Sequence, residues 1–404
     1  MDAKQVNAAV EKAREYIDGL TIKSPVNVPG EVLAAQDRFF TWDNEKRSPL
    51  SNKGFLYDYS YYNGVVMEGL YDVYETEPES GKAYYDYVKT YLDGLMKKGE
   101  DGSFELDFDR AGYVDCHGAD CYKTAALFER FSQGDDAYGQ VASRLYRHLT
   151  DESYVNSEGH TPCLDNMPAE LGHNYWHSWR KEPRYKIWLD GIYMLQPFLA
   201  HHAARIGDER QLELIQERLD WVAETLLAPN GMYYHAGNGR EDVCNFFWTR
   251  AIGWYGMAMV DVMEVLPDKY LEKRKAALKL FVDGMLKYQH ESGIWANLAD
   301  MPVTETNRLE TSGTAMLSYT ILKGVRKGWL DRSYQEAGLK AFVGLAEMKL
   351  DEGGLKDIYL KASANGSNNY EETEYYFTDE GKGSGPFIMA YSEVEPLVWH
   401  VLMR

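Results

Sequence analysis

Residues 187–227 read IWLDGIYMLQPFLAHHAARIGDERQLELIQERLDWVAETLL. Apolar residues recur with the 3.6-residue period of an α-helix on both sides of Gly207-Asp208, which is a turn signal. The beginning of the first half carries small and aromatic residues, whereas the second half, 209–227, shows the charged and apolar faces of an ordinary surface helix. The stretch therefore predicts a tight helical hairpin whose first helix faces inward.

The same alternation continues along the chain. Short connections such as Gly134-Asp135-Asp136 and Leu266-Pro267-Asp268 follow one helix, and long connections rich in Gly, Asn and aromatic residues follow the next. Six hairpins closed in a ring form an all-α (α/α)6 barrel, and we expect a single domain over 1–404. A sheet-based fold and a repeat solenoid are weaker alternatives, because period-two segments are few and no consensus recurs at a fixed spacing. The twelve predicted helices span 4–20, 57–75, 80–98, 119–133, 136–150, 187–206, 209–227, 247–265, 268–289, 311–327, 331–349 and 386–403.

In such a barrel one helix of each pair lines the inside, and the long connections gather at one end. We expect the binding site at that end. The helices that follow long connections begin with small and aromatic residues, for example Tyr61-Tyr62-Asn63-Gly64 and Thr311-Ser312-Gly313. The inner helices are predicted at 57–75, 119–133, 187–206, 247–265, 311–327 and 386–403.

The composition limits the partners of the protein. A formal net charge of −20 over 404 residues argues against nucleic acid and against an anionic membrane surface, because a phosphate backbone needs a basic footprint. Aromatic residues make up 14% of the chain, enough to line a cleft with rings, and rings stack on the flat C–H faces of sugars. The composition therefore favours a carbohydrate ligand, with any acidic group on it met by a local cationic residue.

Four cysteines are too few and too irregularly spaced for a disulfide framework, so we interpret them as reduced and mostly buried thiols. The chain opens directly into a helical pattern, with neither a signal peptide nor an apolar run of membrane-spanning length. We expect a cytoplasmic protein, or a periplasmic or secreted one if a leader has been removed. The oligomeric state is not predicted.

Two runs place a charged residue among rings at the start of a helix. In Trp188-Leu189-Asp190 the charge is a carboxylate, and in Phe247-Trp248-Thr249-Arg250 it is a guanidinium. A lone residue of this kind is usually a packing residue or a helix cap, and Arg250 is open to a buried ion pair, but two such runs in one chain favour a pocket built from helix N-termini.

The candidate site residues sort by chemical type. Carboxylates supply acid–base capacity, cationic and imidazole side chains supply hydrogen bonds, and rings supply stacking surfaces. No phosphate-binding glycine loop and no nucleophile elbow competes, and Cys116, His117 and Cys121 lack the second pair that a zinc site requires. We therefore expect no metal and no cofactor. The candidates are Asp190, Asp115 and Asp120 for acid–base chemistry and Tyr62, Asn63, His177, Trp188, Met194, His235, Trp248, Arg250, Trp254 and Lys382 for substrate binding.

Five motifs resemble, in order, those of glycoside hydrolase family 105, the unsaturated rhamnogalacturonyl hydrolases. The similarity runs from about residue 60 to the C-terminus, and five motifs in the right order are far more specific than one. The motifs are Trp188-Leu189-Asp190-Gly191-Ile192-Tyr193-Met194, Tyr233-Tyr234-His235, Phe247-Trp248-Thr249-Arg250-Ala251-Ile252-Gly253-Trp254-Tyr255, Glu310-Thr311-Ser312-Gly313-Thr314-Ala315-Met316 and Lys382-Gly383-Ser384-Gly385-Pro386-Phe387.

The resemblance implies an (α/α)6 barrel and a metal-free reaction on oligosaccharides that begin with a 4,5-unsaturated uronic acid, the product of a polysaccharide lyase. In that reaction an acid protonates C4, positive charge develops at C5 and the ring oxygen, and water adds at C5. The hemiketal then opens and releases the rest of the chain. Such chemistry needs a carboxylic acid that stays protonated until it meets the alkene.

The resemblance also implies residue roles. Asp190 matches the catalytic aspartate, and we expect the rings around it to favour its neutral form. Trp248, Arg250 and Trp254 match subsite residues, and His235 matches a histidine that contacts substrate; we assign Arg250 to substrate oxygens, among them the uronate carboxylate. The second aspartate of the family falls on Asp115 or Asp120, and its His-Lys pair on the segment around His177, both with altered spacing.

Three other functions remain open from the residues. A glucuronidase acting on saturated uronides would use two carboxylates and a water, Asp190 with Asp115 or Asp120. A sugar 2-epimerase would lean on paired histidines, for which only His177 and His235 are available. A sugar-binding protein would use the rings alone, with Asp190 as a hydrogen-bond acceptor.

Overall fold

The structure of this protein is a computed structural model. It describes residues 1–20, 61–107, 122–134, 136–150, 187–237, 244, 246–360 and 376–402. Within these ranges most of the chain is helical. The twelve α-helices are α1 (Ala3–Leu20), α3 (Tyr61–Thr76), α4 (Lys82–Leu95), α6 (Ala125–Phe131), α7 (Ala137–Thr150), α8 (Leu189–Ile206), α9 (Glu209–Leu226), α10 (Thr249–Met263), α11 (Asp268–Leu286), α12 (Thr311–Arg326), α13 (Gln335–Met348) and α14 (Gly381–Leu402), with a 3-10 turn, η6 (Arg332–Tyr334), before α13.

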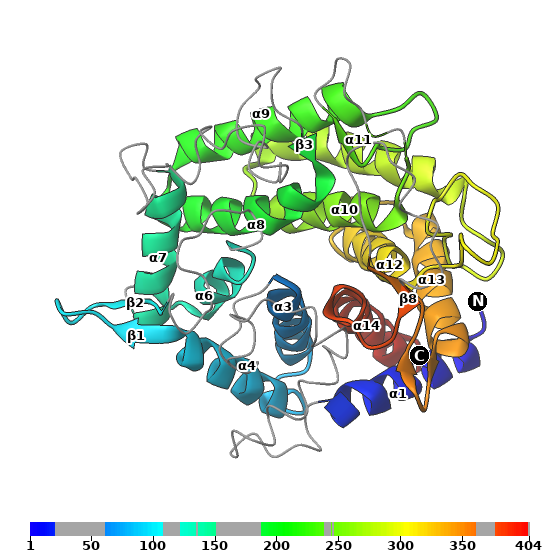
Figure 1. Ribbon diagram of the computed structural model, residues 1–404, viewed down its shortest axis with the longest axis horizontal. Helices are drawn as coiled ribbons and strands as arrows, with labels where there is room; N and C mark the ends of the chain where they lie inside the picture. Colours follow the sequence, from blue (N-terminus) through cyan, green and yellow to red (C-terminus); the bar gives the residue numbers. More distant parts are fainter. Residues whose placement is uncertain are drawn as a thin grey trace.

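The helices form two concentric rings, as Figure 1 shows. In the inner ring α3 packs on α6, α6 on α8, α8 on α10, α10 on α12, α12 on α14 and α14 back on α3. The outer helices α4, α7, α9, α11 and α13 each return beside the inner helix that precedes them. This confirms the predicted (α/α)6 barrel and the predicted set of inner helices.

The hydrophobic pattern explains which helices lie inside. In α8, every residue from Leu189 to Ala200 is buried, because neighbours surround the helix on all sides. In α9, the buried residues form a single stripe that includes Leu212, Ile215 and Leu219, and the rest of the surface is polar. The hairpin 187–227 is therefore a buried helix followed by a half-exposed one, as its sequence predicts.

The barrel closes by pairing the two ends of the chain. The sixth outer helix is α1, which packs against α14 and α13, so this pair is not a hairpin of consecutive helices (Figure 1). On the inside, α14 approaches α3 so closely that a Cβ added to Gly69 would lie 2.8 Å from the carbonyl oxygen of Gly385. Glycine at this position therefore permits the close approach of the two helices.

Short strands connect the helices in four antiparallel pairs. The pairs are β1 (Met96–Lys98) with β2 (Phe104–Leu106), β3 (Ile187–Trp188) with β4 (Ala236–Gly237), β5 (Leu350–Asp351) with β6 (Gly354–Leu355), and β7 (Ile358–Tyr359) with β8 (Tyr376–Phe377). Two of them matter for the site, because β3 leads directly into α8, and the short segment after β8 leads into α14.

Several helix starts differ from their predicted places: α6 begins at Ala125 and not at 119, α13 at Gln335 and not at 331, and α10 at Thr249 and not at 247. The last helix starts earlier than predicted. The sequence predicts that the last helix begins at Pro386, since proline is favoured in a first turn, but α14 begins at Gly381. The carboxylate of Glu380 accepts a hydrogen bond from the backbone N–H of Lys382 at 2.9 Å, and the backbone oxygen of Glu380 accepts from Gly383. This cap starts the helix earlier and leaves Pro386 inside it. No helix in the described part of the chain has the length and apolar character to cross a membrane.

Candidate active site

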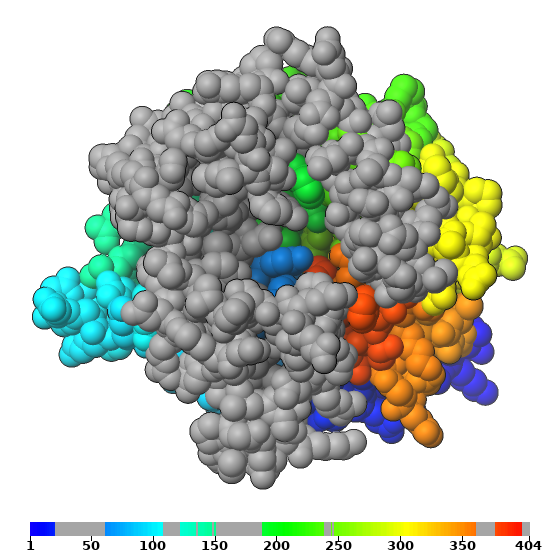
Figure 2. All heavy atoms as spheres, viewed as in Figure 1, coloured from blue at the N-terminus to red at the C-terminus, as the bar shows by residue number. Residues whose placement is uncertain are grey.

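The inner helices begin at one end of the barrel, and the predicted site residues that the structure describes lie on or near these helix starts. Figure 2 shows parts of α3, in blue, and of the segment that leads into α14, in red, near the centre of one face. Asp190 is in the first turn of α8, directly after β3, and its exposed fraction is only 8%. The backbone N–H of Leu189 donates to the carbonyl oxygen of His235 at 3.1 Å, which joins the start of α8 to the segment before β4.

Asp190 faces a buried histidine. The Nε2 atom of His235 lies 3.0 Å from Oδ2 of Asp190, and His235 is fully buried. Burial alone would lower the pKa of this imidazole, but the charge of Asp190 and the hydrogen bond to it, aided by Cys244, outweigh burial and raise the pKa of His235 to about 9. His235 is therefore an imidazolium at neutral pH.

Two tryptophans hold the ring of His235. The centroid of the Trp188 ring lies 4.9 Å from that of His235 in an edge-to-face arrangement, and the Trp248 ring lies 5.0 Å away. The indole N–H of Trp248 donates to Asn297 Oδ1 at 2.9 Å, which fixes that ring. Sequence reasoning missed Asn297, because nothing in its neighbourhood signals contact with a residue 49 positions earlier. The aromatic residues thus exclude water from the imidazole and set its orientation.

Arg250 has one hydrogen-bond donor left over. Its guanidinium lies 4.2 Å above the Trp248 ring, and Nη2 donates to the backbone oxygen of Leu360 at 3.1 Å. Its Nη1 atom is buried and has no hydrogen-bond partner among the described residues, nor does a carboxylate from that part of the chain pair with the side chain. An unsatisfied buried donor costs about 1–3 kcal/mol, more when charged, so this guanidinium is set up for an acceptor supplied by a ligand.

Lys382, Tyr62 and Asn63 gather where α14 and α3 begin. The Lys382 ammonium lies 5.3 Å from the centre of the Tyr62 ring and 2.7 Å from Glu380. A Cβ added to Gly381 would lie 2.8 Å from the carbonyl oxygen of Tyr62, so the two helix starts touch through their backbones. Asn63, in the first turn of α3, is fully buried. The starts of α3 and α14 thus add a cationic side chain, Lys382, and a half-buried ring, Tyr62, to the same end of the barrel as Asp190.

Two predicted substrate-binding residues lie deeper. Met194 is one turn below Asp190 and only 1% exposed, and Trp254 is equally buried and stacks on Tyr193 with ring centroids 5.0 Å apart. In this structure both pack within the core beneath the site, so their contact with substrate stays a prediction.

Three further candidates, Asp115, Asp120 and His177, lie outside the described residues, as do Cys116, His117 and Cys121. Among the residues that are described, no three His, Cys, Asp or Glu side chains are grouped closely enough to hold a metal ion. The structure also adds Cys244, which sequence reasoning interpreted only as a buried thiol. It is buried, as expected, but it also contacts His235.

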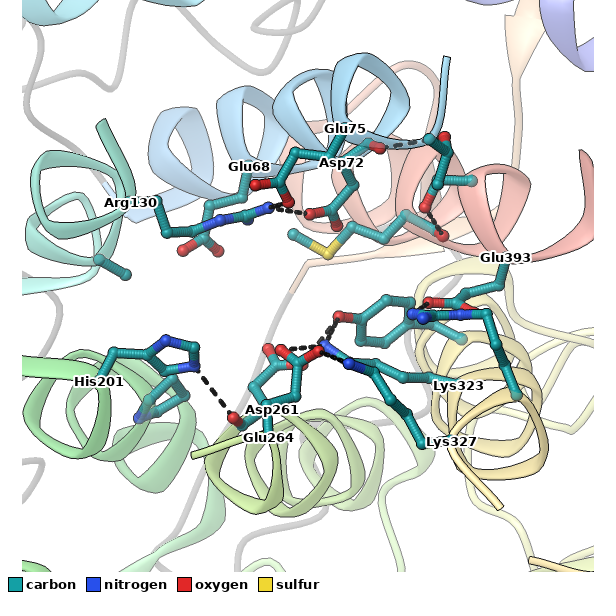
Figure 3. Close-up of a pocket in the computed structure, with 17 residues that line it drawn as sticks. Glu68, Asp72, Glu75, Arg130, His201, Asp261, Glu264, Lys323, Lys327 and Glu393 are labelled. Carbon is teal, nitrogen blue, oxygen red and sulfur yellow. Dashed lines mark hydrogen bonds and ion pairs between the residues drawn. The ribbon is translucent and has the colours of Figure 1, made fainter. Parts of the chain in front are cut away.

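A pocket of about 260 Å³ lies at the opposite end of the barrel, where the inner helices end (Figure 3). Residues from all six inner helices line it, and carboxylates and cations from five of these helices pair with one another. Arg130 lies 2.6 Å from Asp72, Lys323 lies 2.7 Å from Asp261, and Arg326 makes two contacts of 2.5 Å with Glu393. Burial raises the pKa of Asp72 to about 7, against the opposing charges of Arg130 and Lys323. None of the predicted site residues lines this pocket.

One end of this helical barrel contains a buried carboxylate–imidazole pair, two tryptophan rings and a guanidinium with an unsatisfied donor among the described residues. These are the groups that an enzyme acting on acidic sugars needs. The comparisons with known proteins agree with this class. The model of Glycosyl Hydrolase Family 88 matches residues 36–398. The chain therefore belongs to this family and is a glycoside hydrolase.

Individual relatives include family 105 and unsaturated-uronyl hydrolases. A solved family 105 glycoside hydrolase of C. acetobutylicum ATCC 824 is 25% identical, has a TM-score of 0.70, and is matched over 92% of this chain and 99% of that one. An unsaturated 3S-rhamnoglycuronyl hydrolase of Alteromonas sp. (strain LOR) is 22% identical over 68% of this chain and 69% of its own length. A 24.9 kDa protein in the picA locus of Rhizobium radiobacter is 35% identical over 45% of this chain and 91% of its own length. The similarity to family 105 inferred from five motifs is thereby confirmed.

Proposed function

We propose that this protein removes a 4,5-unsaturated uronic acid, galacturonyl or glucuronyl, from the non-reducing end of oligosaccharides made by a polysaccharide lyase. The observation that carries the proposal is the contact of Asp190 with the imidazolium of His235 at the mouth of the barrel. The similarity to the Alteromonas enzyme, which is named for hydrolysis of an unsaturated rhamnoglycuronyl substrate, supports the substrate class.

The proposed reaction uses Asp190 as general acid and then as general base. The protonated carboxyl group gives its proton to C4, and the electron pair of the C4=C5 bond forms the new C–H bond, leaving positive charge on C5 and the ring oxygen. The Asp190 carboxylate then takes a proton from the water that adds to C5. The hemiketal so formed opens, the aglycone leaves, and Asp190 is again protonated for the next cycle.

Asp190 is buried, and one of its carboxyl oxygens lies 3.0 Å from Nε2 of His235. In the proposed cycle a negative charge appears on Asp190 once its proton has moved to C4. His235 thus stabilises the negative charge that appears on Asp190 when its proton leaves.

Arg250 is assigned to the substrate carboxylate. Its Nη1 atom is buried and has no hydrogen-bond partner within the described ranges, in a chain with a net charge of −20. Arg250 lies in the first turn of α10, and a helix N-terminus carries partial positive charge. An anionic sugar entering this end of the barrel would satisfy that donor. Trp248, which stacks under the guanidinium, holds the fork in place.

The decisive experiment follows the ultraviolet absorbance of the conjugated double bond in lyase-generated disaccharides. We expect the absorbance to fall with the enzyme present, without added metal and in the presence of a chelator. Release of a saturated uronic acid from a saturated uronide, with no loss of absorbance from the unsaturated disaccharides, would overturn the proposal in favour of a glucuronidase that uses two carboxylates.

A further inference from the structure

Three backbone segments run side by side next to Asp190. The first leads into α8, where the N–H of Leu189 donates to the oxygen of His235 at 3.1 Å. The second contains His235, whose own N–H donates to the oxygen of Phe246 at 3.2 Å. The third begins at Cys244, whose N–H donates to the oxygen of Ala236 at 2.8 Å. His235 is therefore held in the middle segment, between the segment that supplies Asp190 and the one that supplies Cys244.

The side chains follow the order of the backbone segments, with His235 between Asp190 and Cys244. His235 is fully buried and Cys244 is 1% exposed, and the Cys244 side chain is within hydrogen-bond contact of the imidazole. Nε2 of His235 faces Asp190. Asp190 and Cys244 are the titratable groups that act most strongly on the imidazole, while the rings packed on it, those of Trp188 and Trp248, are uncharged.

We propose that Cys244 is a positioning residue that holds the imidazolium of His235 against Asp190 by accepting a hydrogen bond from its other ring nitrogen, Nδ1. For its effect on catalysis this inference rests on the proposed function, in which His235 stabilises the Asp190 carboxylate. The imidazolium has two N–H donors, and a buried donor without an acceptor disfavours the charged form. Sulfur is a weak acceptor, but in the described part of the chain the Cys244 side chain is within hydrogen-bond contact of the imidazole.

Two substitutions of Cys244 distinguish a hydrogen-bond acceptor from a residue that only fills space. Cys244→Ser keeps a polar atom that accepts a hydrogen bond, whereas Cys244→Ala removes it and leaves a similar backbone. In the alanine variant, the proton on the second nitrogen of His235 has lost its acceptor, so the neutral imidazole becomes more favourable. The pKa of His235 then falls from its raised value of about 9 towards the ordinary 6.5.

The test uses the full chain with labelled histidine, and it compares Cys244→Ala, Cys244→Ser and the control Ile252→Val, which trims a fully buried side chain of α10. Nuclear magnetic resonance follows the titration of each imidazole, and a His235→Gln variant assigns the signal of His235. We expect the His235 midpoint to fall by about one pH unit in the alanine variant, and to stay near that of the parent in the serine variant and the control. An unchanged midpoint in Cys244→Ala would overturn the proposal.

A kinetic readout accompanies the titration. On the alkaline side, kcat of Cys244→Ala should fall at a pH about one unit lower than in the parent, a loss of about tenfold at fixed alkaline pH, with KM unchanged. Serine should restore the parent profile, which a residue that only fills space would not do. If no lyase product is turned over by the parent, the proposed function fails, and the titration of His235 still decides the role of Cys244.

Discussion

The two ends of the barrel contain similar residue types in opposite states of pairing. At the end where the inner helices finish, Arg130, Lys323 and Arg326 each have a carboxylate within 2.7 Å, so the charges there are satisfied by the protein itself (Figure 3). At the end where the helices start, Arg250 keeps a buried donor without a partner in the described residues. A charge that the fold leaves unsatisfied is available to a ligand, and one that the fold pairs serves stability.

Helix direction explains the difference. Helix N-termini carry partial positive charge and helix C-termini partial negative charge, each within about the last turn. The ends that converge on the pocket of Figure 3 therefore favour cations such as Lys323 and Lys327, which lie there near Glu264. The ends that surround Asp190 favour anions, which suits a substrate with a carboxylate. The two ends of the barrel therefore favour charges of opposite sign.

The largest effect is expected from Asp190→Asn, which keeps the shape of the side chain and removes its transferable proton. The rate of absorbance loss should fall by about a thousandfold or more, with folding unchanged by circular dichroism. The matched control is Asp261→Asn at the other end, which breaks an ion pair with Lys323. Near-normal turnover by Asp190→Asn would remove this residue from the mechanism.

Lys323→Met tests whether the ion pairs at the end where the inner helices finish serve stability and not catalysis. The Lys323 side chain is 7% exposed and lies 2.7 Å from Asp261 and 2.9 Å from Glu264, so its removal leaves Asp261 without its cation, while Glu264 keeps its ion pair with Lys327. We expect the free energy of unfolding, measured with urea, to fall by about 3 kcal/mol. Turnover of the folded fraction should stay within about twofold of the parent, since this end does not bind substrate in the proposal. A large loss of kcat at full folding would contradict the division between the two ends.

Raising the pH should weaken the Asp190–His235 contact. The pKa of His235 is raised to about 9 in the folded protein from an ordinary 6.5, so its contribution to stability is complete below pH 6.5 and is lost as the pH rises through about 9. The linked free energy of unfolding is on the order of 3 kcal/mol. Urea unfolding at pH 6 and pH 9.5 should show this decline in the parent and a smaller one in His235→Gln. Equal declines in the two proteins would mean that other groups cause it.

Arg250→Lys should give the smallest of these effects. The ammonium keeps the charge but loses the planar fork that matches a carboxylate, so kcat/KM on unsaturated uronides should fall about ten- to a hundredfold. The comparison is with the same oligosaccharide carrying a methyl ester in place of the carboxylate, for which parent and variant should differ less. An equal loss on both substrates would show that Arg250 acts through packing on Trp248 instead.

Much of the fold could be predicted because its signals are local. The 3.6-residue period and the Gly207-Asp208 turn predict the hairpin of α8 and α9 without reference to any other part of the chain. The pairing of α1 with α14 could not be read in this way, because these helices lie at opposite ends of the sequence and no local pattern links them.

The candidate site was predicted less completely. Asp190, Trp248 and Arg250 stand out in sequence, since charges among rings at helix starts are unusual. The partner of Arg250 is the backbone oxygen of Leu360, 110 residues later, and any residue type offers such an oxygen. Cys244 looked like an ordinary buried thiol in the sequence. Its contact with His235 exists only because the chain around Cys244 pairs with the chain around Ala236 in the folded protein.

The sequence by itself determined the helices, the inner and outer faces and the residues whose chemistry suits a sugar acid, because hydrophobic periodicity and residue type are properties of short stretches. Only the tertiary structure decided which charges are satisfied. The guanidinium of Arg130 meets Asp72, 58 residues earlier, while the Nη1 atom of Arg250 has no hydrogen-bond partner among the residues that the structure describes. Nothing in either side chain distinguishes the two cases. Their difference arises because hydrogen bonds and ion pairs depend on distances of a few ångströms between distant segments, which exist only once the barrel has closed.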